Sequence, residues 1–309
     1  MTRYVVTRIG QAAISLLVVA VVVFLLSRIS GDPVEMMLPV EASAAEQQAL
    51  RQQLGLDSPL VVQFATFMAD LARGDLGRSF RFNAPVLDLL LQRAPSSLLL
   101  AFAAIAIALA VGLPVGVLAA QRPGSLLDRV ARTLAVAGQS IPTFVVGVVL
   151  VLLVSVEWRL LPSSGSGSWR HLVLPAATLG WFSTAAIARM ARSSMLEALH
   201  ANYVTVARAK GLPERVVVAR YALPNALTTI ISLSALQFVI LASGAVITEA
   251  IFDWPGIGLL MVQGAFARDY ALVQGVVILA AFTTVIVNLL ADILYALADP
   301  RITLTRKAG

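Results

Sequence analysis

Six long stretches of this chain carry almost no charge, and this pattern limits the folds that are open to it. At 1.5 Å per residue, about 20 apolar residues in a helix cross the roughly 30 Å hydrocarbon core of a bilayer. Charged residues make up 13% of the chain, against about 25% in a typical soluble domain. We therefore predict an all-α, polytopic membrane protein with six transmembrane helices, at residues 9–26, 97–120, 133–156, 174–191, 228–247 and 272–297.

The distribution of Lys and Arg predicts the orientation of these helices. Six spans place both termini on the same side, and most of the basic residues then lie in segments on that side. The two short loops on the other side carry only Arg159, Arg170 and Arg268. The long segment 30–96 carries five more arginines, but long segments cross the membrane largely regardless of charge. Because basic loops stay inside, we expect both termini in the cytoplasm of a bacterial cell.

Several classes of function are disfavoured by what the chain lacks. It has no cysteine, and its two histidines, His171 and His200, are too few for a histidine-rich metal site. No nucleotide-binding Gly-rich loop, zinc-protease motif or nucleophile elbow is present. The net charge of +6 is explained by cytoplasmic loops rather than by nucleic-acid binding. We expect no catalytic residue, no metal site and no cofactor bound by this chain.

The segment between the first two spans, residues 30–96, is predicted to fold as helices outside the membrane. Ser43-Ala-Ala-Glu46 reads as a capping box that opens a helix to Leu54, with Gly55 at its end. A second helix is predicted from Pro59 to about Leu71, and Gly74 follows it. Such a long segment either caps the spans or binds a partner, and its length favours binding.

The segment 192–225 carries an amphipathic pattern on the cytoplasmic side. Leu199, Tyr203, Val206 and Lys210 recur at helical spacing until Gly211 and Pro213 interrupt them. A second helical piece then runs through 216–221 and ends near Pro224. Periodicity alone leaves two readings open: a helix lying on the membrane surface, or a helix that docks on a partner protein.

Polar side chains within the spans are candidates for a transport path. The ionisable residues Arg189, Glu249 and Asp292 are expected near span ends, which leaves no obvious proton relay inside the membrane. Most of the neutral groups are expected to bridge helices. The residues that we expect to line a path are Gln139, Ser140, Ser234, Gln237 and Asn288. Without a charged relay, the energy source is expected on another chain.

The chain resembles, from end to end, the permease subunits of dipeptide and oligopeptide ABC importers. Its cytoplasmic segment Tyr203-Val-Thr-Val-Ala-Arg-Ala-Lys-Gly-Leu-Pro213 is similar to the coupling loop of that family, although Asn202 and Tyr221 depart from the usual Asp and His. Further strings that resemble the peptide-permease branch are Gly31-Asp-Pro33, Gly55-Leu-Asp57, Gly74-Asp-Leu-Gly-Arg-Ser79, Ser140-Ile-Pro142, Leu174-Pro-Ala-Ala-Thr-Leu-Gly180, Glu249-Ala-Ile-Phe-Asp-Trp-Pro-Gly-Ile-Gly258, Arg268-Asp-Tyr270 and Asp299-Pro-Arg301.

This resemblance implies a type I ABC importer permease fold and a set of partners. A second homologous permease would complete the path, two ATPase domains would bind ATP-Mg below it, and an extracytoplasmic binding protein would deliver the solute. The implied coupling residues are Tyr203, Ala207, Arg208, Ala209, Lys210, Gly211, Arg220 and Pro224. The expected divisions are an N-terminal helix at 1–29, the outer insertion at 30–96, a five-helix domain at 97–299 that includes the loop 192–225, and a tail at 300–309.

The function expected from these features is ATP-driven import of di- or oligopeptides through the bacterial plasma membrane. The same architecture importing nickel, glutathione or another small solute is the alternative. A secondary transporter that uses a proton gradient and a non-transporting membrane scaffold are more remote readings. The sequence leaves open the solute, and whether the second permease is a paralogue or a copy.

Overall fold

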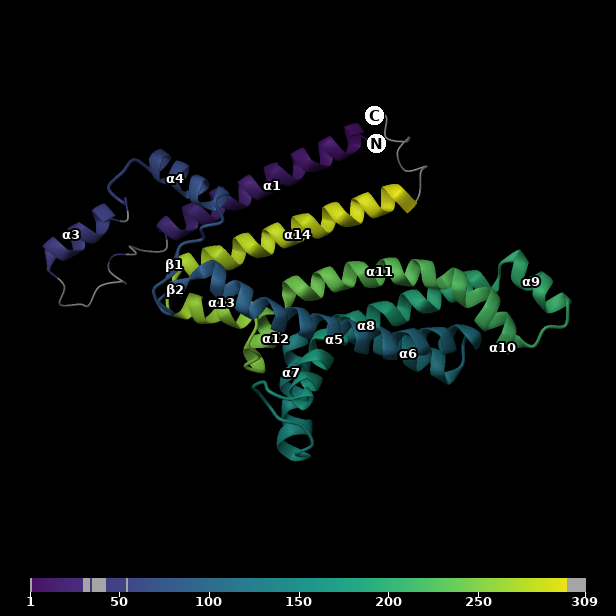
Figure 1. The fold of residues 1–309 in the computed structure, drawn as a ribbon. Coiled ribbons are helices and arrows are strands. Elements are labelled where there is room, and N and C mark those ends of the chain that lie inside the picture. Colours follow the sequence, from purple (N-terminus) through teal and green to yellow (C-terminus); the bar gives the residue numbers. More distant parts are fainter. Residues whose placement is uncertain (1, 30–33, 35–42, 54, 299–309) are drawn as a thin grey trace. The chain divides into compact units, whose positions relative to one another are not determined.

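The computed structural model describes the backbone of residues 2–29, 34, 43–53 and 55–298, and this part of the chain is mostly helical (Figure 1). It forms two compact units. One contains Met1–Arg93 and Leu260–Gly309, and the other contains Ala94–Leu259. The predicted all-α class is confirmed.

In the first unit, the first and last long helices lie side by side (Figure 1). They are α1 (Thr2–Ile29) and α14 (Tyr270–Ala298). A shorter helix, α4 (Leu60–Ala72), packs against the end of α1. The Phe24 ring lies 5.3 Å from that of Phe64, and Arg28 Nε donates to Gln63 Oε1 at 2.9 Å. Aromatic packing and one polar contact therefore attach the insertion to the first span.

The predicted capping box is present before α3 (Ala44–Gln53). The Ser43 backbone N–H donates to the Glu46 carboxylate at 2.8 Å, and the Glu46 N–H donates to Ser43 Oγ at 3.3 Å. Gly55 follows α3 and Gly74 follows α4, with φ of 65° and 78°. Such values suit glycine, which has no Cβ to clash. Both predicted outer helices are confirmed, although Leu54 lies outside the described residues, as do Gly31-Asp-Pro33 and Asp299-Pro-Arg301.

A short hairpin between α4 and α5 was not predicted. Its strands β1 (Arg78–Ser79) and β2 (Ala84–Pro85) pair antiparallel. Ser79 Oγ donates to the fully buried carboxylate of Asp269 at 2.5 Å, and the Arg81 N–H donates to the same oxygen at 3.2 Å. Asp269 immediately precedes α14, so these bonds tie the hairpin to the start of the last helix.

The second unit consists of long helices that pack through small residues. Its elements are the part of α5 (Val86–Gln121) from residue 94, α6 (Leu126–Ser140), α7 (Thr143–Leu150), η1 (Val151–Glu157), α8 (Trp169–Leu199), α9 (Asn202–Ala209), α10 (Glu214–Val216), η2 (Val217–Ala222), α11 (Leu223–Gly244), α12 (Val246–Ile251) and the start of α13 (Ile257–Phe266). A Cβ on Gly112 or Gly116 of α5 would overlap the backbone of α8. These glycines therefore let the two helix backbones approach closely.

The third predicted span is not one straight helix, which corrects the expectation for residues 133–156. The helix axis turns by 105° between α6 and the α7–η1 segment, and α7 points away from the line of α6 (Figure 1). Proline has no N–H to donate and disfavours helical geometry in the residue before it. Ile141 accordingly has φ −83° and ψ 122°, and Pro142 caps the next helix. The string Ser140-Ile-Pro142 thus marks a break in the span.

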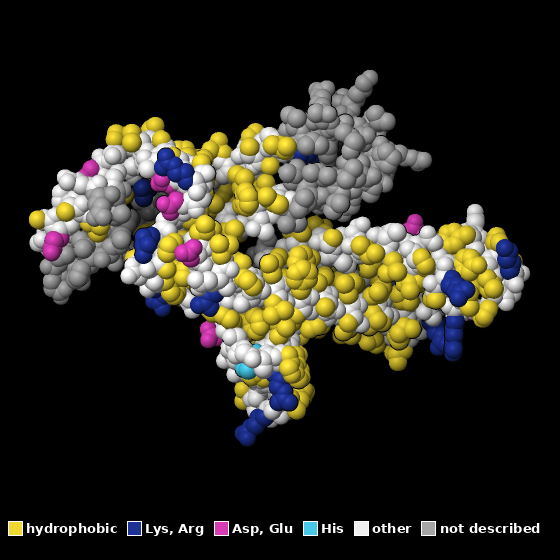
Figure 2. Space-filling model, in the orientation of Figure 1, with side chains coloured by type: hydrophobic (Ala, Val, Ile, Leu, Met, Phe, Trp, Pro, Cys, Tyr) yellow, Lys and Arg dark blue, Asp and Glu magenta, His cyan; other side chains and the backbone are white. Residues whose placement is uncertain are grey.

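Four of the described helices are long and apolar enough to cross a membrane, or five if the bent pair counts as one span. They occupy Thr7–Leu26, Val86–Gln121, Trp169–Leu199 and Glu214–Ala242, so several extend beyond the predicted bounds. The sixth predicted span falls within α14, whose 29 residues have the length of a span; its described side chains end at Ile286. Hydrophobic side chains cover much of the visible flank of the helices in the second unit (Figure 2).

Candidate functional site

The predicted helix–turn–helix of the loop 192–225 is present. Helix α9 ends at Ala209, the chain turns, and α10 begins at Glu214 after Pro213. Gly211 lies in the turn with φ of 75°, and a Cβ placed on it would meet no atom within 4 Å. The need for glycine here is therefore conformational rather than steric. The predicted interruption of the helical pattern at Gly211 is confirmed.

An ion pair closes the turn around Gly211. Arg208 Nη2 donates to Glu214 Oε1 at 2.7 Å, and its Nε donates to Oε2 at 3.2 Å. The two side chains are 44% and 57% exposed, so water and salt screen the pair. Arg208 thus holds the end of α9 against the start of α10. Its guanidinium group is used in this contact within the chain.

The two faces of α9 have different surroundings. Val204 and Ala207 are buried in a core cluster that also contains Val217 of η2. Tyr203 and Val206 are 40% and 55% exposed. Ala207, one of the implied coupling residues, is thus packed against residues of the same chain, among them those of η2.

Most of the other implied coupling residues are exposed. Val206, which was not among the implied coupling residues, is exposed beside them. Ala209, Lys210, Arg220 and Pro224 all lie on the surface of the chain. Val206 was part of the amphipathic pattern but not among the expected contact residues. Lys and Arg side chains gather at the end of the second unit that carries α9 and α10 (Figure 2).

Three of the expected path residues line cavities in the second unit. Gln139 and Ser140 line a cavity of about 410 Å³ where α6 breaks, together with Ser183 of α8. Gln139 and Gln237 line a second cavity of about 320 Å³ between α6, α8 and α11. Ser183 Oγ donates to Gln237 Oε1 at 3.1 Å, which joins α8 to α11. The structure therefore brings Gln139, Ser140 and Gln237 to one side of α8.

The other two expected path residues are Ser234 and Asn288. Ser234 is buried and its hydroxyl donates to the Ile230 carbonyl oxygen of its own helix at 2.7 Å. Neither of the two cavities described above is lined by Ser234. Asn288 belongs to α14, but its side chain is outside the described part of the structure. The described contacts place neither residue at these two cavities.

Arg189 lies within α8 rather than at the end of that helix. Helix α8 continues to Leu199, about 15 Å further along the axis at 1.5 Å per residue. Arg189 Nη1 donates to Gln139 Oε1 at 2.6 Å, and both residues line the 320 Å³ cavity.

Two family models together match most of the chain. Residues 1–101 match the N-terminal region of the binding-protein-dependent transport system membrane component, and residues 112–304 match the binding-protein-dependent transport system inner membrane component. The chain belongs to this family. It is thus a permease subunit of an ABC importer in the inner membrane, as the resemblance implied.

The relatives that match this permease along its full length include glutathione permeases. It is 37% identical to the glutathione transport system permease protein GsiC of Escherichia coli strain K12 over 303 residues. The match covers 98% of this chain and 99% of the relative. The protein of the same name from Salmonella choleraesuis strain SC-B67 is 38% identical over the same length.

Solved structures show the same permease fold. An inward-facing structure of the MetNI methionine ABC transporter matches with a TM-score of 0.54 and 22% identity, covering 68% of this chain and 96% of the other. An amino acid ABC transporter with histidines matches with a TM-score of 0.53 and 16% identity, covering 67% and 92%. The predicted type I permease fold is confirmed.

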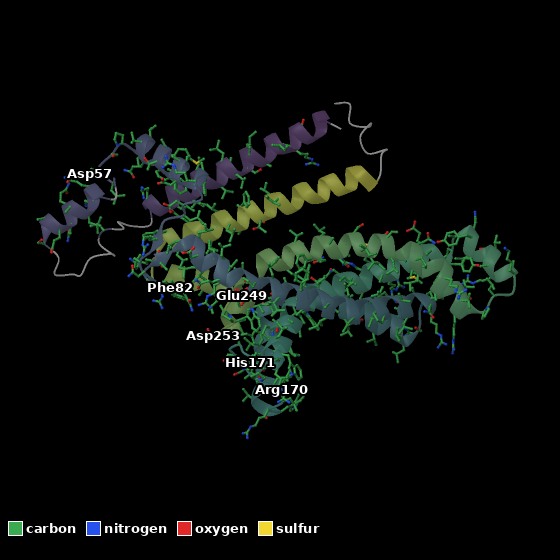
Figure 3. All side chains as sticks on the ribbon, viewed as in Figure 1. Asp57, Phe82, Arg170, His171, Glu249 and Asp253 are labelled. Carbon is green, nitrogen blue, oxygen red and sulfur yellow. The ribbon has the colours of Figure 1, made fainter. Side chains whose placement is uncertain are left out.

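A buried carboxylate in the permease joins three elements of the second unit. Ser97 Oγ donates to Glu249 Oε1 at 2.6 Å, and the N–H groups of Gly258 and Leu259 donate to Oε2 at 2.7 and 3.1 Å. Ser97 Oγ also accepts from the Ile257 N–H at 2.9 Å. Glu249, labelled in Figure 3, is fully buried on α12. Glu249 and Gly258 belong to one of the strings that resemble the peptide-permease branch, whereas Ser97 belongs to none of them.

Proposed function

We propose that this permease carries short peptides, glutathione among them, together with a second homologous permease. The full-length identity to glutathione permeases carries the proposal, because it extends over 98% of the chain rather than over one motif. Glutathione is itself a small peptide with free carboxylates, so the peptide and glutathione readings describe one chemical class. An extracytoplasmic binding protein would deliver the solute.

The energy would come from ATP-Mg bound by two partner ATPase domains. Helix α9 supports docking on such a partner, because its inner face is anchored by Val204 and Ala207 while Tyr203 and Val206 remain exposed. An exposed aromatic beside an aliphatic residue on a rigid helix suits a pocket in a partner. Arg208 and Gly211 would hold the helix and its turn in shape for this contact.

The docking proposal is tested by Val206→Asp, with Thr205→Asp as the matched control. Both residues are exposed on α9, but Thr205 lies about 100° around the helix from Val206 and off the face that carries Tyr203. A carboxylate buried in the contact costs several kcal/mol. Val206→Asp should therefore lose ATPase subunits on co-purification, and Thr205→Asp should retain them. Equal recovery with both variants would reject docking through this face and favour a helix on the membrane surface.

Both termini of the permease are proposed to lie in the cytoplasm, with α9 on the same side. Because the chain has no native cysteine, any labelling of this subunit by a maleimide comes from the single cysteine that is introduced. Ser166→Cys in the exposed loop before α8 should react with a membrane-impermeant maleimide added to whole cells. Thr205→Cys should react only after the membrane is permeabilised. Labelling of Thr205→Cys in intact cells would reverse the orientation.

Transport itself is tested with the purified importer in proteoliposomes. Radiolabelled glutathione or a tripeptide should accumulate only when ATP and the loaded binding protein are both supplied. Nickel should not accumulate. If the permease alone takes up peptide under a proton gradient, the chain is a secondary transporter. If ATPase subunits co-purify but no solute accumulates, it is a scaffold.

A further inference from the structure

We propose that Arg189 and Gln139 form a site in the path that binds a carboxylate group of the transported solute. This inference rests on the proposed function, because it names the chemical group by which the path would hold a small peptide. Charged side chains within membrane helices are costly and usually have a specific partner. Arg189 lies inside such a helix and needs an explanation of this kind.

Arg189 differs from the neighbouring arginines in what it contacts. Arg192, one turn further along α8, pairs with Asp128, and Arg208 pairs with Glu214. Among the residues that the structure describes, no carboxylate lies within 4.0 Å of Arg189, and its one hydrogen bond is to Gln139. Its guanidinium group has five N–H donors, so most of them are available to a ligand.

Two cavities meet at Arg189, and the side chains around them favour an anion. Arg189 and Ser193 line both the 320 Å³ cavity and a neighbouring cavity of about 290 Å³. Arg132 and Arg192 line the second cavity as well. None of the described residues that line these cavities is acidic, and Asp128 is the acid that pairs with Arg132 and Arg192. Three arginines against one aspartate leave an excess of positive charge.

Two glutamines present hydrogen-bond donors to this site, because their amide oxygens already accept hydrogen bonds from other residues. Gln139 Oε1 already accepts from Arg189, and Gln237 Oε1 already accepts from Ser183. The amide NH₂ groups of both side chains make no hydrogen bond within the described part of the chain, and both line the 320 Å³ cavity. An ionised carboxylate only accepts hydrogen bonds, and a guanidinium matches its two oxygens with two parallel N–H groups. A carboxylate therefore suits this site better than a cation or an amide.

The test uses the full importer complex in detergent and a cysteine at Ser193, which lines both cavities. Ser193→Cys is labelled with a maleimide, and labelling is scored on the permease band of a gel. Trialanine, which has a free carboxylate, is compared with its C-terminal amide, and S-methylglutathione serves as a second, thiol-free acid. The acids should slow labelling at concentrations at which the amide does not.

Removing the charge should remove this difference. In Ser193→Cys with Arg189→Gln, the concentration of trialanine that halves the labelling rate should rise about tenfold or more, because a hydrogen-bonded charge partner is lost. Arg129→Gln in the same background removes a charge from an exposed site that lines neither cavity, and should leave the protection as it is.

Three outcomes overturn the inference. They are equal protection by the acid and the amide, unchanged protection after Arg189→Gln, and loss of the second permease from the Arg189→Gln complex without any effect of solute on labelling. The last outcome would show that Arg189 pairs with a carboxylate of the other permease. Uptake by the wild-type importer tests the proposed function separately, since peptide uptake with none of the predicted protection would reject only this site.

Discussion

Arg192 donates two hydrogen bonds to Asp128, which lies 64 residues earlier in the chain, at 2.5 and 3.1 Å. Asp128 is 1% exposed and also accepts from the Gly124 N–H at 2.9 Å, while its own N–H donates to the helix-capping Ser125. One carboxylate thus closes the turn before α6 and joins α6 to α8. Gln139 and Arg189, the residues of the proposed carboxylate site, lie on the same two helices, so this pair helps to position them.

Asp128→Asn should destabilise the permease by leaving the Arg192 guanidinium without its counter-charge. Breaking a buried pair costs about 3–5 kcal/mol, and the 23% exposure of Arg192 places the effect at the lower end. A lower melting temperature in detergent is the measurement. Arg132 lies 3.6 Å from Asp128 and is 55% exposed, so Arg132→Gln should cost less than about 1 kcal/mol. Similar melting temperatures for both variants would contradict this assignment.

Ser97→Ala should weaken the junction of α5, α12 and α13. The hydroxyl both donates to Glu249 and accepts from the Ile257 N–H, so its loss leaves two buried groups short of a partner. The expected loss is about 1–3 kcal/mol. The neighbouring Ser96→Ala is the control, because only the main-chain oxygen of Ser96 is used, by the Trp254 indole. Melting temperatures that fall equally for both would show that the hydroxyl is not the cause.

Gly116→Ala should force α5 and α8 apart. The added methyl group would overlap the carbonyl oxygen of Ala188 and the side chain of Ala191. Overpacking of this kind costs about 1–3 kcal/mol. Gly10→Ala in α1 is the control, since its Cβ would meet nothing within 4 Å. The prediction is checked by thermal stability and by recovery of folded protein, and a Gly116→Ala permease as stable as Gly10→Ala would be evidence against the close approach.

Gly211→Ala should uncouple ATP hydrolysis from uptake more than it destabilises the fold. A side chain at φ 75° costs about 1–2 kcal/mol, and the turn can avoid this strain by shifting α9. Gly74→Ala places the same strain, at φ 78° with no atom near the Cβ, in the outer segment. The ratio of solute imported to ATP hydrolysed should fall for Gly211→Ala alone. A similar fall in both variants would point to general strain.

Local sequence patterns predicted the structure correctly where residues close together in the chain determine it. The capping box of Ser43 and Glu46 is present, because its partners are three residues apart and meet in the first turn of any helix. The end of α9 before Gly211 was likewise expected from a glycine that interrupts an amphipathic pattern. The α6 break at Pro142 was missed, since hydropathy continues across it and only backbone geometry ends the helix there.

The apolar windows by themselves determined that this chain is a helical membrane protein. In lipid a helix satisfies its backbone hydrogen bonds within the segment, and windows of about 20 residues match a spanning helix rather than the shorter strand of a barrel. Which polar residues meet was decided only by the tertiary structure. Ser79 and Asp269, or Ser97 and Glu249, belong to separate strings of sequence and become partners because the folded helices place them side by side. The packing of α9 turned Ala207 inward and left Val206 exposed, although both positions are apolar and adjacent. A periodic pattern defines a face, but only the neighbours of that face determine whether it is buried.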